Sequence, residues 1–195
     1  MSQKDQIKWD KKYTENHTLL GFREASPLLR QFLFSAGGTK ALDVACGTGR
    51  NTLYLAQNGF EVDALDISAV ALQELTQHMH KITDLAHIHT QLVDLDSYTP
   101  SLSSYDLIIQ TNFLDRRLIP LLAQALAKNG ILIIETYMLD PENEKKGSNE
   151  SYLLRPGELP GYFDEHYEIL FYDEFWNRGE NYRMRKQGIV VKRLS

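Results

Sequence analysis

Short apolar runs and helical apolar spacing alternate along the first two thirds of the chain. Continuous apolar runs bounded by glycine or polar residues predict buried strands at 41–45, 60–67, 87–93, 105–110 and 131–137. Apolar positions at helical spacing predict helices at 9–13, 27–34, 51–58, 69–82 and 118–128. Alternation of strands and helices is typical of an α/β protein with a mostly parallel sheet.

The pattern changes in the last third of the chain. Residues 138–149 are polar and rich in proline, glutamate, lysine and glycine, which predicts a long loop or lid. A proline-glycine pair predicts a short helix at 156–159. The segments 167–175 and 183–192 alternate apolar and polar residues and predict a hairpin whose turn begins at Asn177.

Together these elements predict one α/β domain over residues 1–195. We expect a Rossmann-like, mostly parallel seven-stranded sheet with helices on both faces and a C-terminal antiparallel β-hairpin. No internal repeat or linker divides the chain.

Composition narrows the class of protein. The chain has 195 residues, 43% hydrophobic and 24% charged, which suits one globular domain. Its formal net charge of −5 argues against a nucleic-acid partner, which needs a basic face. Cys46 is the single cysteine, which excludes a disulfide scaffold. The polar start and the lack of an apolar run near the ~20 residues of a membrane helix predict a cytoplasmic protein without a membrane partner.

The first strand-turn-helix segment carries the candidate chemistry, Asp43-Val-Ala-Cys-Gly-Thr-Gly-Arg-Asn. Its glycines allow a ligand to approach the backbone, and the start of the next helix offers free N–H groups. Asp66 ends the second strand, where a carboxylate accepts hydrogen bonds from ribose hydroxyls. Asp94 and Leu95 follow the third strand and add an acceptor and an apolar wall. The segment therefore predicts a nucleoside-containing ligand.

The spacing Asp-x-Ala-x-Gly-x-Gly, from Asp43 to Gly49, resembles motif I of class I S-adenosylmethionine-dependent methyltransferases. That resemblance covers residues 41–137. It implies that Asp43 contacts the methionine amino group, that Asp66 binds the ribose, and that Ile67, Asp94 and Leu95 contact adenine. The cofactor would be S-adenosyl-L-methionine and the product S-adenosyl-L-homocysteine.

Two further stretches resemble the tellurite-resistance methyltransferase (TehB-like) branch: Gly49-Arg-Asn-Thr-Leu-Tyr-Leu-Ala with Gly59-Phe-Glu-Val-Asp-Ala-Leu-Asp, and Leu154-Arg-Pro-Gly-Glu-Leu. This resemblance implies a small-molecule acceptor, such as a thiol, selenite or tellurite, and a monomer or homodimer. Arginines and a histidine assist in the C-terminal part of that branch. Here Arg178, Arg183 and Arg185 lie in that part, and no histidine follows His166.

The candidate site residues fall into two sets. The expected cofactor-binding residues are Tyr13, Asp43, Ala45, Cys46, Gly47, Gly49, Asn51, Asp66, Ile67, Asp94, Leu95, Gln110 and Asn112. The expected catalytic residues are Arg155, Arg183 and Tyr137, with the two arginines as a clamp for an anionic acceptor and no metal. Residues 1–38 would form a helical cap, 39–137 the cofactor-binding half, and 138–195 the acceptor side.

Alternatives stay open at this point. Thr52 stands where a dinucleotide fingerprint needs a small residue, so an NAD-dependent oxidoreductase is the weaker alternative. A non-catalytic S-adenosylmethionine-binding module is another. Tyr13 fits core packing as well as cofactor contact, and Arg155 fits a structural ion pair as well as a clamp. Arg116 and Arg117 fit a solvated face.

Overall fold

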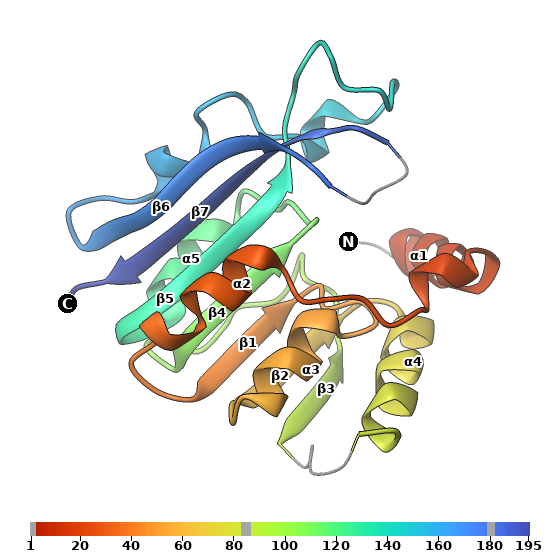
Figure 1. Cartoon of the computed structure of the whole chain (residues 1–195), viewed down its shortest axis with the longest axis horizontal. Helices are drawn as coiled ribbons and strands as arrows, with labels where there is room; N and C mark the ends of the chain where they lie inside the picture. The colour runs from red at the N-terminus through yellow and green to blue at the C-terminus, as the bar shows by residue number, and fades with distance from the viewer. Residues whose placement is uncertain (1–2, 83–86, 179–181) are drawn as a thin grey trace.

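The computed structural model describes residues 3–82, 87–178 and 182–195, which fold around one seven-stranded sheet (Figure 1). The strand order is β3-β2-β1-β4-β5-β7-β6. β1 to β5 pair in parallel, and β7 runs antiparallel to both β5 and β6. The strands are β1 Lys40–Val44, β2 Glu61–Asp66, β3 Ile88–Leu92, β4 Tyr105–Thr111, β5 Leu126–Tyr137, β6 Tyr167–Trp176 and β7 Arg185–Arg193.

Helices cover both faces of the sheet, as the sequence predicts. On one face Leu29 of α2 and Leu53 of α3 pack in a core with Leu75 of α4. On the other face α5 packs Leu118 and Leu122 against the sheet. The α-helices are α1 Gln3–Glu15, α2 Pro27–Phe32, α3 Arg50–Gln57, α4 Ala69–His80 and α5 Leu118–Ala125. Short 3-10 turns are His17–Leu19, Leu33–Ser35, Glu150–Tyr152 and Leu159–Tyr162.

The helix predicted at 118–128 is wrong at its C-terminal end. α5 ends at Ala125, and β5 begins at Leu126, which pairs with Tyr105 of β4. The alanines around this point favour a helix, but pairing with the sheet overrides that local preference. Asn129 then takes a positive φ of 66° within the irregular start of β5. The short helix that residues 156–159 are expected to open takes the form of the 3-10 turn Leu159–Tyr162, with Glu158 at its N-cap.

The segment after β5 is fastened to the C-terminal hairpin. Asn143 is buried, its Nδ2 donates to the carbonyl of Met138, and its Oδ1 accepts from the backbone N–H of Arg185. The Glu144 carboxylate accepts from the backbone N–H of Arg183. The hairpin itself is confirmed by the antiparallel pairing of β6 with β7. Residues 179–181 of its expected turn lie outside the described residues.

Candidate cofactor site and acceptor side

In the loop between β1 and α3, the backbone lies close to side chains of other elements. Gly49 has a φ of 82°, and a Cβ there would collide with the side chain of Leu75 on α4. Gly47 has a φ of 57°, and a Cβ there would lie 2.7 Å from the hydroxyl of Tyr13. Both positions need glycine for conformation and for space. The space beside these two glycines is taken by the side chains of Leu75 and Tyr13, and the approach of a ligand to this loop stays a prediction.

Asp66 closes this loop from the end of β2. Its Oδ2 accepts from the backbone N–H of Gly47 at 2.8 Å, and its Oδ1 accepts from the N–H of Ser68 at 2.8 Å. Burial raises the pKa of the Asp66 carboxyl, while the N–H donors from Ser68 and Gly47 oppose that rise. Ile67 is buried beside it. The carboxylate therefore stands at the carboxyl end of β2, beside the glycine loop.

Asp43 lies deeper, at 1% exposure, and is held by Thr52. The Thr52 hydroxyl donates to Asp43 Oδ2 at 2.6 Å. Burial raises the pKa of Asp43 to about 7, against the opposing effects of the Thr52 hydroxyl and the Arg50 charge. The residue that departs from the dinucleotide fingerprint is therefore the partner of the first acidic residue of the motif. A direct contact of Asp43 with a cofactor amino group stays a prediction.

The N-terminal helix lies over the same end of the sheet, beside α4 (Figure 1). Asp10 Oδ1 accepts from the Ser68 hydroxyl at 2.6 Å and from the Val70 N–H at 3.3 Å. Tyr13 is 8% exposed, and burial raises the pKa of its phenol well above the ordinary range. Tyr13 packs in the interior, and its hydroxyl stands over Gly47. Its contact with a cofactor stays a prediction.

The remaining predicted cofactor residues surround this loop. Leu95 is fully buried, whereas Asp94 is half-buried and caps its own turn by accepting from the Asp96 N–H at 3.0 Å. Gln110, at the end of β4, is fully buried, and its Oε1 has no hydrogen-bond partner among the described residues. Burial raises the pKa of the Cys46 thiol, which suits a packing role for that side chain. Ala45, half-buried, has a positive φ of 55°.

The two arginines predicted to clamp the acceptor, Arg155 and Arg183, make different contacts. Arg155 is exposed, and its backbone carbonyl accepts from Gln187 while its N–H donates to Glu158 at 2.7 Å. Arg183 is exposed too, and its guanidinium lies 3.9 Å from the ring centre of Trp176. The clamp that would use both arginines stays a prediction.

Arg116 holds in place the segment with the sequence Leu-Arg-Pro-Gly-Glu-Leu. The expectation that Arg116 belongs to a solvated face is therefore corrected. Its Nε donates to Glu158 Oε1 at 2.6 Å, and a second N–H donates to Oε2 at 3.0 Å. It also donates to the carbonyls of Ser151 and Leu153. The guanidinium thus fixes the segment that carries Arg155. Its partners lie 35 to 42 residues away, which hid this role in the sequence.

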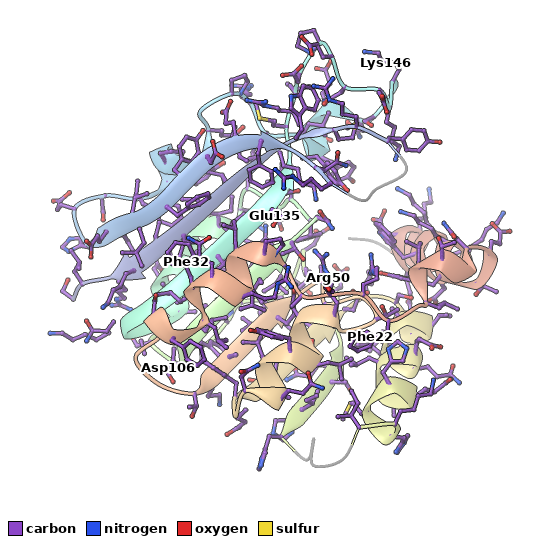
Figure 2. The ribbon with its side chains drawn as sticks, in the orientation of Figure 1. Phe22, Phe32, Arg50, Asp106, Glu135 and Lys146 are labelled. Atoms are coloured by element: carbon purple, nitrogen blue, oxygen red, sulfur yellow. The ribbon has the colours of Figure 1, made fainter. Side chains whose placement is uncertain are left out.

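A buried polar network was not predicted from the sequence. Lys186 on β7 donates to Glu135 on β5 at 3.2 Å and to Asn112 Oδ1 at 2.8 Å. The Ser26 hydroxyl donates to the other Glu135 oxygen at 2.9 Å. Figure 2 shows Glu135 near the tip of β5 and Arg50 at the start of α3, at the same end of the sheet. The one sequence feature that could have indicated this network was a lysine among the buried positions of β7.

Two predicted site residues border this network. The Tyr137 ring centre lies 4.6 Å from the Lys186 ammonium. Asn51 is 2% exposed, accepts from the Ser26 N–H at 2.9 Å and donates to Thr111 at 3.2 Å. Asn51 therefore links the start of α3 to the network, and its contact with a cofactor stays a prediction.

Residues 4–194 match the family model described as Tellurite resistance protein TehB. The chain belongs to the TehB family. A curated relative, the probable S-adenosyl-L-methionine-dependent methyltransferase TehB of Haemophilus influenzae strain Rd, is 28% identical over 160 residues, covering 78% of this chain and 54% of that protein. The chain therefore spans about half the length of this TehB relative. The resemblance drawn from the sequence is confirmed at the level of the family.

Solved structures agree on the fold. The crystal structure of TehB from H. influenzae has a TM-score of 0.71 at 22% identity, over 87% of this chain and 62% of that one. The [4+2]-cyclase SpnF has a TM-score of 0.70 at 14% identity, over 86% of this chain and 78% of that one. These matches confirm the Rossmann-like architecture. A cyclase on this fold means that the fold alone does not fix the reaction.

Within residues 3–82, 87–178 and 182–195 no helix has the length and apolarity to cross a bilayer. In the same residues no group of three or more His, Cys, Asp or Glu side chains is arranged to hold a metal ion.

Proposed function

We propose that the protein is an S-adenosyl-L-methionine-dependent methyltransferase acting on a small molecule. The observation that carries this proposal is the Asp66 carboxylate at the end of β2, held against the N–H of Gly47 in a glycine loop. The name of the H. influenzae relative supports the cofactor assignment. The formal net charge of −5 favours a small acceptor over a nucleic acid.

The residues present fit this cofactor. Glycine at positions 47 and 49 lets Tyr13 and Leu75 pack against the loop, which holds the loop at the carboxyl end of β1. Asp66 would bind the ribose hydroxyls, Ile67 and Leu95 would contact adenine, and Asp94 would accept from its amino group. Gln110 brings a buried carbonyl oxygen to the end of β4.

The chain's own contribution to the reaction would be positioning. When bound, the cofactor supplies a methyl group already activated on a sulfonium. The Tyr13 hydroxyl over Gly47 and the anchoring of α1 through Asp10 would exclude water from that end of the site. Tyr137 and Asn112 would shape the side from which the acceptor approaches. Correct placement of two reactants contributes as much as ~7–11 kcal/mol to lowering a barrier.

Calorimetric titration tests the cofactor. We expect micromolar binding of S-adenosylmethionine and S-adenosylhomocysteine and none of NAD. The Asp66→Asn variant should bind both about 10- to 100-fold more weakly, because hydrogen bonds to a charged group contribute ~1.5–3 kcal/mol. Glu61→Gln, at the exposed start of the same strand, serves as the control and should bind like the wild type.

Each result has a distinct meaning. A folded protein that binds neither compound would contradict the proposed function. Unchanged affinity in Asp66→Asn would contradict the placement of the ribose at β2. Formation of S-adenosylhomocysteine in the presence of small thiols, selenite, tellurite and phenols would separate an enzyme from a non-catalytic binding module.

A further inference from the structure

The peptide bond between Thr48 and Gly49 lies within the glycine loop and is held at both ends. Its N–H, on Gly49, donates to the carbonyl of Cys46 at 3.0 Å. Its carbonyl, on Thr48, faces Nδ1 of His78 at 3.4 Å. Because glycine adopts φ values of either sign, a peptide beside Gly49 can turn over at little steric cost. The contacts of this peptide therefore decide in which direction the polar groups of the loop point.

The last turns of α4 bring His78 to the loop, where its side chain is buried at 8% exposure. One turn earlier, Leu75 fills the space beside Gly49. At the N-cap of the same helix, the N–H of Ser68 donates to Asp66. α4 thus supports both the carboxylate and the glycine loop of the candidate cofactor site.

Both ring nitrogens of His78 face oxygens that can only accept hydrogen bonds. Nδ1 faces the Thr48 carbonyl, and Nε2 lies 3.3 Å from Oε1 of Glu74. A neutral imidazole carries one N–H, whereas the doubly protonated ring carries two and can donate to both oxygens. Hydrogen bonds to a charged group are the stronger ones, so in a neutral ring the carboxylate of Glu74 keeps the single N–H. The contact with Thr48 is therefore the one that depends on the second proton.

A groove of about 580 Å³ beside His78 gives solvent access to this part of α4. Phe22, labelled in Figure 2, lines one side of the groove, with its ring edge-on to the imidazole at a centre-to-centre distance of 6.4 Å. Among the described residues, the charged groups that line the groove with His78 are Glu74 and Lys81, both on α4. Gln57 of α3 contributes an amide, and the glycine loop contributes a carbonyl. The charges that act on His78 here therefore come from its own helix, and the groove lets the ring exchange its proton with solvent.

We propose that His78 is a positioning residue for the cofactor, because its doubly protonated ring donates to the Thr48 carbonyl and keeps the glycine loop in the orientation that binds S-adenosyl-L-methionine. This inference rests on the proposed methyltransferase function. Histidine is the side chain that ordinarily changes charge between about pH 5 and 8. Loss of the proton leaves a lone pair of Nδ1 facing the carbonyl of Thr48, which releases the loop. Cofactor affinity therefore falls as the pH rises.

Calorimetric titration with S-adenosylhomocysteine at about pH 5.5 and about pH 8.5 tests this inference. His78→Phe keeps a planar ring and removes both donors, so it is the reference at each pH. Comparison at the same pH cancels proton exchange by the ligand and by Asp43. His80→Gln is the matched control, because His80 lies on the same helix and is exposed. Urea denaturation checks that every variant is folded.

At the lower pH, the wild type should bind about 5-fold more tightly than His78→Phe, as expected for one hydrogen bond. At the higher pH, the two should bind alike. Glu74→Gln should bind about 5-fold more tightly than His78→Phe at both pH values. In that variant a neutral ring can donate from Nδ1 to Thr48 and accept at Nε2 from the new side-chain amide. His80→Gln should follow the wild type.

Contrary outcomes separate this inference from the proposed function. Equal binding by the wild type and His78→Phe at the lower pH would overturn the inference. So would the same ratio between these two proteins at both pH values, or a Glu74→Gln variant that binds no more tightly than His78→Phe at the higher pH. Failure of the wild type to bind at either pH would instead overturn the proposed function.

Discussion

The two sides of the site are built over different distances along the chain. On the cofactor side, Asp66 is bonded to Gly47, 19 residues away, and Asp43 to Thr52, 9 residues away. On the acceptor side, Glu135 is bonded to Ser26 at a separation of 109 residues.

That difference decides what a sequence reveals. Hydrogen bonds within one β-α-β unit produce a fixed spacing of glycines and carboxylates, which is recognisable as a motif. Bonds between distant strands leave no spacing to recognise. The glycine loop is therefore recognisable from the sequence, whereas the network around Glu135 is visible only in the structure.

The largest expected effect on stability comes from removing the buried charge of Lys186. Lys186→Met alone leaves the Glu135 carboxylate buried without its cation. We expect the free energy of unfolding to fall by about 3–5 kcal/mol, measured by urea denaturation. Adding Glu135→Gln should restore much of that loss, and Lys192→Met should cost no more than about 0.5 kcal/mol. A loss below about 1 kcal/mol for Lys186→Met would mean that the pair is well solvated.

A second prediction concerns Asp43 and the way in which the stability of the protein depends on pH. Burial raises the pKa of Asp43 from 3.8 to about 7, so the folded state holds this proton more tightly than the unfolded state does. The resulting stabilisation is complete below about pH 4 and is lost as the pH rises through about 7.

Asp43→Asn removes this dependence. Between pH 4 and 7, the wild type should lose about 3 kcal/mol of stability relative to the variant, since each tenfold change in proton binding corresponds to about 1.4 kcal/mol. Denaturant unfolding at several pH values measures the difference. A difference that stays flat with pH would show that Asp43 is ionised throughout and held by other donors.

The third and smallest expected effect is the difference in stability loss between substitutions at two glycines with similar backbone angles. Gly49→Ala adds a methyl group against Leu75 at a φ of 82° and should lower the free energy of unfolding by about 3 kcal/mol. Gly59→Ala, at a φ of 85° with no heavy atom within 4 Å, should cost only about 1 kcal/mol. Thermal unfolding of both variants measures the gap. Equal losses would show that the close approach of the loop to α4 is unimportant for stability.

Much of the fold follows from the sequence because its evidence is local. The runs of buried residues around Leu42 and Ile133 place two parallel strands, and the glycine loop places the site between β1 and α3. The end of α5 was predicted wrongly because the helix preference of the alanines is local, while the pairing of Leu126 with Tyr105 is not.

The contacts of Lys186 show even more clearly that partners distant in the chain cannot be predicted from local sequence. Lys186 was missed because nothing near it in the chain identifies Glu135 or Asn112 as its partners. Tyr137, predicted as a catalytic residue, lies beside the Lys186 ammonium, and its part in the reaction stays a prediction. Arg155 and Arg183 were chosen by residue type, and the structure leaves their joint role as a prediction.

The position of β7 has a consequence for biosynthesis. β7 follows β6 in the chain, yet it lies between β5 and β6 in the sheet. As the chain leaves the ribosome, the strands β1 to β5 can pair while the outer edge of β5 is still open. An open strand edge is a site for pairing with other chains. Delivery of β7 both closes that edge and brings Lys186 to Glu135, so protection from aggregation and completion of this buried ion pair arrive together.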